Sequence, residues 1–173
     1  MILYLLYVII LTNKRYEFTT EKKGDAAMLT TFKATAKKLP DGLQVETNVR
    51  NFKILMDEPE ELGGTNAGMN PVEALLCALG ACQTIVASAF APAHNFTFDE
   101  FHVELEGDMD PDGFMGLADV RNGFQEIRFV MHFKTDEPKE KVEEYAKFIE
   151  RTCPVGDCLA NGVKLVLAGV KID

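Results

Sequence analysis

A long apolar segment, "NPVEALLCALGACQTIVASAF" from Asn70 to Phe90, constrains the fold more than any other part of the sequence. It predicts a helix with Asn70 as its N-cap, Pro71 at the first helical position and Glu73 placed as in a capping box. Apolar side chains follow on every side, so the predicted helix has almost no polar face. Such a helix is either a core element or an oligomer interface.

Alternating patterns on both sides of this helix predict strands. Before it, a Pro-Asp-Gly turn separates two alternating stretches, 30–39 and 43–55, which is typical of a β-hairpin. After it, residues 96–107 and 124–135 alternate between apolar and polar side chains, as half-buried strands do. Residues 163–172 predict a closing strand.

A second helix is expected at 136–153, because apolar residues recur there at helical spacing. The expected apolar stripe consists of Val142, Tyr145, Ile149 and Cys153. Together these elements predict an α+β fold in which antiparallel sheet surrounds one buried helix.

Composition limits the partners of this chain. A net charge of −9 and a pI near 4.9 disfavour nucleic acids and anionic membranes, which attract clustered Lys and Arg. The opening segment "MILYLLYVIIL" is shorter than the roughly 20 residues of a membrane-spanning helix and lacks the features of a signal peptide. We therefore expect residues 1–27 to form an N-terminal arm, residues 28–173 one domain, and the protein to be cytoplasmic and not attached to a membrane.

The cysteines are the first candidates for chemistry. Cys82 lies in the apolar helix, and Cys153 ends the second helix immediately before Pro154. A buried cysteine is often only a small apolar side chain. Two cysteines on the core faces of different helices also suit a peroxidatic thiol and a resolving thiol. Cys77 and Cys158 are expected to be packing residues, although Cys158 is also close enough in sequence to pair with Cys153.

Glu73 has two interpretations. Helix capping explains its position without any chemistry. On an ideal helix it lies about 13 Å along the axis from Cys82 and on the opposite side, so contact with that thiol in the same chain is excluded. It can act at a site only through another residue or across a subunit interface.

Two metal-binding patterns are weighed and set aside. The segment "DMDPDGFMGLAD", residues 108–119, is similar to a calcium-binding loop, but predicted strands flank it and Asp119 replaces the usual Glu. An acidic connection between two strands is the better interpretation. The histidines have no spacing typical of metal ligands, so we expect neither a metal nor a cofactor; they are His94, His102 and His132.

These features resemble the OsmC/Ohr family of organic hydroperoxide reductases. The resemblance rests on four segments: "NPVEALLCALGAC", "VELEGDMDPDGFMG", "GFQEIRFVMHF" and the "CPV" after the second helix. It covers nearly the whole chain after the N-terminal arm. The resemblance implies an OsmC-like fold, with sheets wrapped around central helices in an intertwined homodimer whose active sites lie at the interface.

The resemblance also implies roles for individual residues. Cys82 matches the family's peroxidatic cysteine, and Cys153 matches its resolving cysteine. Arg50 lies at about the place in the sequence where the family has its activating arginine. The family's glutamate directly follows Asn-Pro, where this chain has Val72, so Glu73 would have to hold Arg50 across the dimer. Other arginines are alternatives for the activating cation: Arg121, Arg128 and Arg151.

The sequence thus predicts a Cys-based peroxidase. An organic hydroperoxide is its substrate, a Cys82–Cys153 disulfide forms during turnover, and an external dithiol reduces that disulfide. The alternative is a dimeric binding protein for an apolar or acyl ligand, without peroxidase activity.

Overall fold

The computed structural model describes residues 29–172. The predicted N-terminal arm, residues 1–27, lies outside them. The chain divides into two compact units, which meet between Asn70 and Pro71, and each is described separately below.

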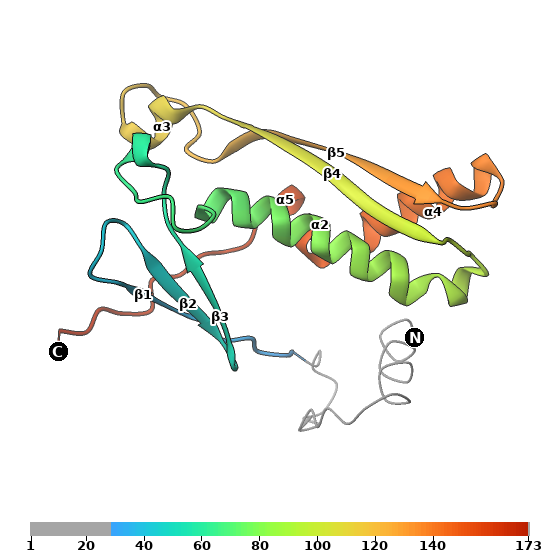
Figure 1. Ribbon diagram of the computed structural model, residues 1–173, viewed down its shortest axis with the longest axis horizontal. Coiled ribbons are helices and arrows are strands. Elements are labelled where there is room, and N and C mark those ends of the chain that lie inside the picture. The colour runs from blue at the N-terminus through green and yellow to red at the C-terminus, as the bar shows by residue number, and fades with distance from the viewer. Residues whose placement is uncertain (1–28, 173) are drawn as a thin grey trace. The chain divides into compact units, whose positions relative to one another are not determined.

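The first unit is a three-stranded antiparallel sheet (Figure 1). Its strands are β1 (Thr35–Lys38), β2 (Val45–Val49) and β3 (Phe52–Met56), in the order β1-β2-β3. The predicted hairpin at the Pro-Asp-Gly turn is confirmed as the β1–β2 connection. The stretch after that turn forms two strands, because the chain turns at Arg50, which adopts the left-handed conformation with φ 58°.

A tightly folded loop completes the first unit. It contains a short 3₁₀ helix, η1 (Glu60–Leu62), and the buried carboxylate of Asp57. One oxygen of Asp57 accepts hydrogen bonds from the Thr65 hydroxyl (2.6 Å), the Thr65 amide (2.9 Å) and the Ala67 amide (3.1 Å). A Cβ at Gly64 would lie 1.8 Å from the Glu58 carbonyl oxygen, so only glycine allows this close backbone approach.

The second unit places helices beside a long two-stranded antiparallel sheet (Figure 1). Its long helix is α2 (Pro71–Phe90), and the strands are β4 (Glu100–Met109) and β5 (Phe124–Lys134). The short helix η2 (Pro92–His94) follows α2, and α3 (Pro111–Met115) connects the two strands. The remaining helices are α4 (Lys139–Thr152) and α5 (Pro154–Asn161). The predicted start of the apolar helix at Pro71 is confirmed, as are both predicted strands and the second helix.

The core of the second unit lies between α2, α4 and the inner face of the sheet. From the predicted stripe of α4, Tyr145, Ile149 and Cys153 are buried. The Tyr145 hydroxyl donates a hydrogen bond of 2.6 Å to the carbonyl oxygen of Ala87 in α2, and its ring stacks on Phe96 with 4.3 Å between centroids. These contacts fix α4 against α2.

One expectation about the second unit is wrong, and one helix of that unit was not predicted. Residues 163–172 form no strand, because a strand must hydrogen-bond to a neighbour and none of the described strands pairs with this segment. Residues 154–161, for which no element was predicted, form α5.

In the single chain, α2 is buried on one side only. Its buried positions include Leu79 and Val86, whereas Ile85 is 67% exposed. By length and composition α2 also satisfies the criteria for a membrane span, a test that core helices of water-soluble proteins pass as well. The second unit, taken by itself, therefore leaves an apolar face of α2 uncovered.

Candidate active site

Two thiols from different helices meet in the second unit. Cys82 lies in the middle of α2 and is half-buried, while Cys153 lies between α4 and α5 and is 1% exposed. The two thiols lie near enough for Cys82 to contribute to the raised pKa of Cys153. Both cysteines are reduced. The geometry therefore brings the predicted pair together; the role of each thiol stays a prediction.

The junction of α4 and α5 positions Cys153. Pro154 cannot continue α4, since a proline inside a helix removes one backbone hydrogen bond, and it instead occupies the first position of α5. Cys153 becomes the N-cap of α5, and its Sγ accepts a hydrogen bond of 3.3 Å from the Gly156 amide. A single proline thus ends one helix, starts the next and directs the thiol toward α2.

Burial raises the pKa of the Cys153 thiol above its ordinary value. The neighbouring Cys82 thiol raises it further, whereas the Gly156 amide opposes the rise by stabilising the thiolate. At neutral pH Cys153 is therefore a protonated, shielded thiol. Cys82 is the more accessible of the two.

A groove of about 720 Å³ lies in the second unit; neither thiol lines it, but Gln83, the residue after Cys82, does. It is bordered by α2, β5 and α5, and its apolar residues include Val72, Leu75 and Leu79. Gly156, whose amide contacts Cys153, also lines it. The size and the apolar wall suit a small ligand with a hydrocarbon part.

Gln83 is a polar residue that sequence reasoning missed. It follows Cys82 in α2, lines the groove and is 1% exposed. Its Oε1 is buried without a hydrogen-bond partner among the residues that the structure describes. A buried, unpaired acceptor is costly, and a ligand that donates a hydrogen bond would relieve that cost. The only signal in the sequence is a glutamine in an otherwise apolar helix.

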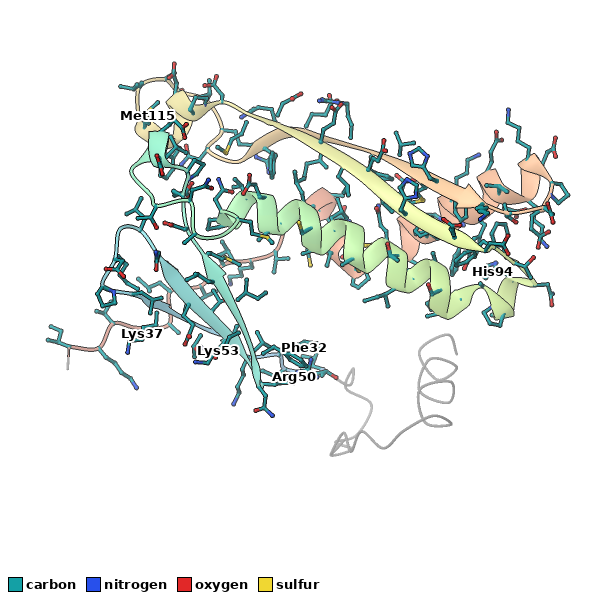
Figure 2. All side chains as sticks on the ribbon, viewed as in Figure 1. Phe32, Lys37, Arg50, Lys53, His94 and Met115 are labelled. Atoms are coloured by element: carbon teal, nitrogen blue, oxygen red, sulfur yellow. The ribbon has the colours of Figure 1, made fainter. Side chains whose placement is uncertain are left out.

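The other predicted site residues belong to different units, Arg50 to the first and Glu73 to the second. Arg50 lies in the first unit, at the β2–β3 turn, with its guanidinium 5.0 Å from the centre of the Phe52 ring (Figure 2). Glu73 lies in the first turn of α2, on the same continuous helix as Cys82, as expected.

The alternative arginines differ in their surroundings. Arg121 and Arg151 line the groove. Arg128 is engaged by three carboxylates at 2.6 to 2.8 Å: Glu106, Asp108 and Glu126. The hydrogen bonds that Arg128 donates to these carboxylates, first of all to Asp108, raise its pKa. Arg128 is thus already engaged, whereas Arg121 and Arg151 border the ligand space.

The remaining cysteines were expected to pack in the core, and that expectation is wrong for the single chain. Cys77 and Cys158 are both exposed. Cys77 lies on a side of α2 that the second unit by itself leaves uncovered, which is why its apolar surroundings in the sequence were misleading.

The acidic segment, residues 108–119, begins within β4, contains α3 and has structural uses. Asp108 pairs with Arg128, and Asp110 caps α3 by accepting a hydrogen bond of 3.0 Å from the Asp112 amide. The segment connects two strands, as expected.

Comparison with known proteins agrees with this architecture. The model of the OsmC-like protein family matches residues 64–168. The chain is 28% identical over 125 residues to a hydroperoxide reductase of Mycoplasma genitalium, with 70% of this chain and 82% of that protein covered. It is 25% identical over 165 residues to a hydroperoxide reductase of Mycoplasma pneumoniae, with 92% and 96% covered.

A solved structure supports the same assignment. The crystal structure of an OsmC-like protein from Mycoplasma pneumoniae superimposes with a TM-score of 0.67 at 23% identity, covering 76% of this chain and 88% of that one. At this identity the likeness concerns the fold alone. The fold, the matched segment and these relatives together place this chain in the OsmC-like protein family.

Proposed function

We propose that this protein is a thiol-dependent peroxidase that reduces organic hydroperoxides. The single observation that supports this most strongly is the meeting of a half-buried Cys82 and a buried Cys153 from different helices. Two relatives that cover most of the chain carry the name hydroperoxide reductase, which agrees with the proposal. The reaction needs no cofactor, and its site is cytoplasmic, where thiols stay reduced.

In the first step the Cys82 thiolate attacks the distal peroxide oxygen. The O–O bond breaks, an S–O bond forms, and the alkoxide takes a proton and leaves as an alcohol. Cys82 becomes a sulfenic acid. The groove accommodates the hydrocarbon part of the peroxide, and Gln83 Oε1 accepts a hydrogen bond from the peroxide O–H. The accessibility of Cys82 favours it over Cys153 as the attacking thiol.

In the second step Cys153 attacks the sulfenic sulfur. A Cys82–Cys153 disulfide forms and water leaves. An external dithiol then reduces the disulfide by thiol–disulfide exchange and is itself oxidised. The raised pKa of Cys153 suits this order, because a protonated thiol does not compete with Cys82 for the peroxide.

A cation that stabilises the Cys82 thiolate completes the proposal. Arg50 is our first candidate, held by Glu73 of a second copy of the chain. Arg121 and Arg151 are the alternatives, because they line the groove. Arg128 is the weakest candidate, because three carboxylates engage it.

We further propose that the protein works as an intertwined homodimer. The uncovered apolar positions of α2 support this, as does segment 163–172, which has strand composition but no strand partner in the described chain. Leu165, Leu167 and Ile172 are all highly exposed there. A second copy supplies both a helix face and a strand edge. Sedimentation that finds a folded monomer at micromolar concentration contradicts this part of the proposal.

The second candidate function is ligand binding without turnover, which the apolar groove favours. One experiment separates the two. Reduced protein is treated with one equivalent of cumene hydroperoxide and its peptides are mapped. We expect a Cys82–Cys153 disulfide in the wild type, a stable sulfenic acid at Cys82 in Cys153→Ser, and no peroxide consumption in Cys82→Ser.

The control is Cys77→Ser, which removes an exposed thiol on the same helix and should retain full turnover. A Cys153–Cys158 disulfide, or survival of all four thiols in excess peroxide, rejects the peroxidase mechanism in favour of ligand binding.

A further inference from the structure

Three metal-ligating side chains gather on the outer face of the β4–β5 sheet, away from the thiol pair. They are His102 and Glu104 from β4 and His132 from β5. Their ligand atoms all lie within 4.8 Å of one another. His102 and Glu104 are two residues apart on one strand and so point to the same face, and His132 is the register partner of His102. Paired strands therefore hold the three side chains together.

The two imidazole rings are already aligned. They stack with 4.4 Å between centroids and an angle of 4° between their planes. In this arrangement each neutral ring can offer a nitrogen lone pair to one shared cation. The Nε2 of His132 is buried and forms no hydrogen bond to any residue that the structure describes.

We propose that His102, Glu104 and His132 form a binding site for a divalent transition-metal cation, with Zn²⁺ as the first candidate. Two imidazole nitrogens and one carboxylate oxygen form a typical three-ligand set for zinc, and water can occupy the fourth position. Hard cations such as Mg²⁺ and Ca²⁺ prefer oxygen ligands and fit this set poorly.

The distances fit a tetrahedral ion with small adjustments. Metal–ligand bonds of about 2.1 Å at tetrahedral angles separate neighbouring ligand atoms by about 3.4 Å. The Nε2 of His132 lies 3.4 Å from Glu104 Oε2, so one edge of the tetrahedron is already formed. The other separations, up to 4.8 Å, close by rotation of exposed side chains about their own bonds.

The surrounding charges favour a cation. On this face of the sheet, carboxylates outnumber basic residues. Arg128 is already paired with three of them, and Lys134 is paired with Glu100. Neither basic side chain pairs with Glu104, whose ion-pair contact among the described residues is with His132. A bound cation would supply the missing positive charge and would join β4 to β5 across the sheet.

This site was not expected from the sequence, in which the histidines have no ligand spacing. The ligands are neighbours through strand register, which pairs residue 102 with residue 132. Only the pairing of the strands reveals the cluster.

The test is calorimetric titration of the reduced full-length protein with Zn²⁺. We expect His102→Gln and His132→Gln each to weaken Zn²⁺ binding by at least about tenfold, and Glu104→Gln to weaken it as well. Glu106→Gln is the matched control: it removes the same charge from the same face of the same strand and should leave binding unchanged. His94→Gln, in η2 just after the end of α2 (Figure 2), controls for the loss of a histidine.

Cys82 and Cys153 could bind zinc themselves, so the experiment needs a second measurement. With Co²⁺ as the probe, the proposed site gives tetrahedral d–d bands without thiolate charge-transfer bands, and these d–d bands disappear in His132→Gln. Zn²⁺ should also raise the midpoint of thermal unfolding in the wild type and in Glu106→Gln but not in His132→Gln. Equal affinity in all variants, or a Co²⁺ spectrum with thiolate bands alone, overturns the proposal.

Discussion

The Gly156 amide donates a hydrogen bond of 3.3 Å to Cys153 Sγ, and this bond opposes the effect of burial on that thiol. Since burial raises the pKa of Cys153, we expect its alkylation by iodoacetamide to become rapid only at a pH above the ordinary thiol value of about 8.5. Gly156→Pro removes the amide hydrogen and should move this pH still higher. The matched control is Gly156→Ala, which keeps the amide and places a methyl group at ordinary contact distance, 3.5 Å from the Cys153 Cβ. Equal dependence of alkylation on pH in the two variants would show that the hydrogen bond from the Gly156 amide has no effect on the pKa of Cys153.

Replacement of the activating cation should slow peroxide reduction without unfolding the protein. An opposite charge near a thiolate lowers its pKa by about 1–3 units, so its loss should slow the reaction at neutral pH by at least about tenfold. We expect this for Arg50→Met, measured by stopped-flow with cumene hydroperoxide. Arginine and methionine both carry a Cβ, so the left-handed backbone at position 50 costs about the same conformational free energy with either residue.

Lys53→Met is the control for Arg50→Met, because it removes a cation from the neighbouring strand of the same sheet. If Arg50→Met reacts at the wild-type rate while Arg121→Met or Arg151→Met is slow, the groove supplies the cation and Arg50 has no part in activation.

Gln83→Leu should slow peroxide reduction without lowering the stability of the protein. The substitution removes a buried oxygen that has no partner in the described chain, so the free energy of unfolding should stay equal or rise. Loss of one hydrogen bond of about 0.5–1.5 kcal/mol to the peroxide should lower the reduction rate about two- to twelvefold. Chemical denaturation and peroxide kinetics on the same samples test both parts. A destabilised variant with an unchanged rate would identify Gln83 as a packing residue only.

The first unit should lose stability in acid. The Thr65 hydroxyl, more than any other partner, lowers the pKa of Asp57 to about 2, so the folded state favours the carboxylate. Stability from this group is present above the unfolded-state pKa, near 3.9, and is lost as the pH falls through about 2. Asp57→Asn should remove this dependence and lower the unfolding midpoint at neutral pH. Asp41→Asn, in the exposed β1–β2 turn, is the control and should change neither the loss of stability in acid nor the unfolding midpoint at neutral pH. Unfolding of the two variants is compared by circular dichroism between pH 7 and pH 2.

Local patterns predicted the elements of the second unit well. Alternation defined β4 and β5, and the stripe that contains Tyr145 and Ile149 defined α4, because each pattern reflects one buried face. Pro154 was recognised as the end of α4 but not as the start of α5, since a proline has both uses. Segment 163–172 has the composition of a strand, but composition supplies no neighbour to pair with.

The site was predictable only in part. The meeting of Cys82 and Cys153 followed from two apolar helix faces that share one core. The role of Gln83 depends on an unpaired oxygen and a groove, neither of which a sequence pattern contains. Exposure of Cys77 was missed because an apolar helix surface looks the same in sequence whether or not its own chain covers it.

The close approach of Gly64 to the Glu58 carbonyl has a consequence for how this chain can vary. Surface loops ordinarily accept insertions and most substitutions. Here a single added methyl group would meet backbone, and backbone cannot rotate aside as a side chain does. The loop that encloses Asp57 should therefore tolerate mutation as poorly as a core strand, and in a library of random variants we expect position 64 to remain glycine while exposed strand positions change freely.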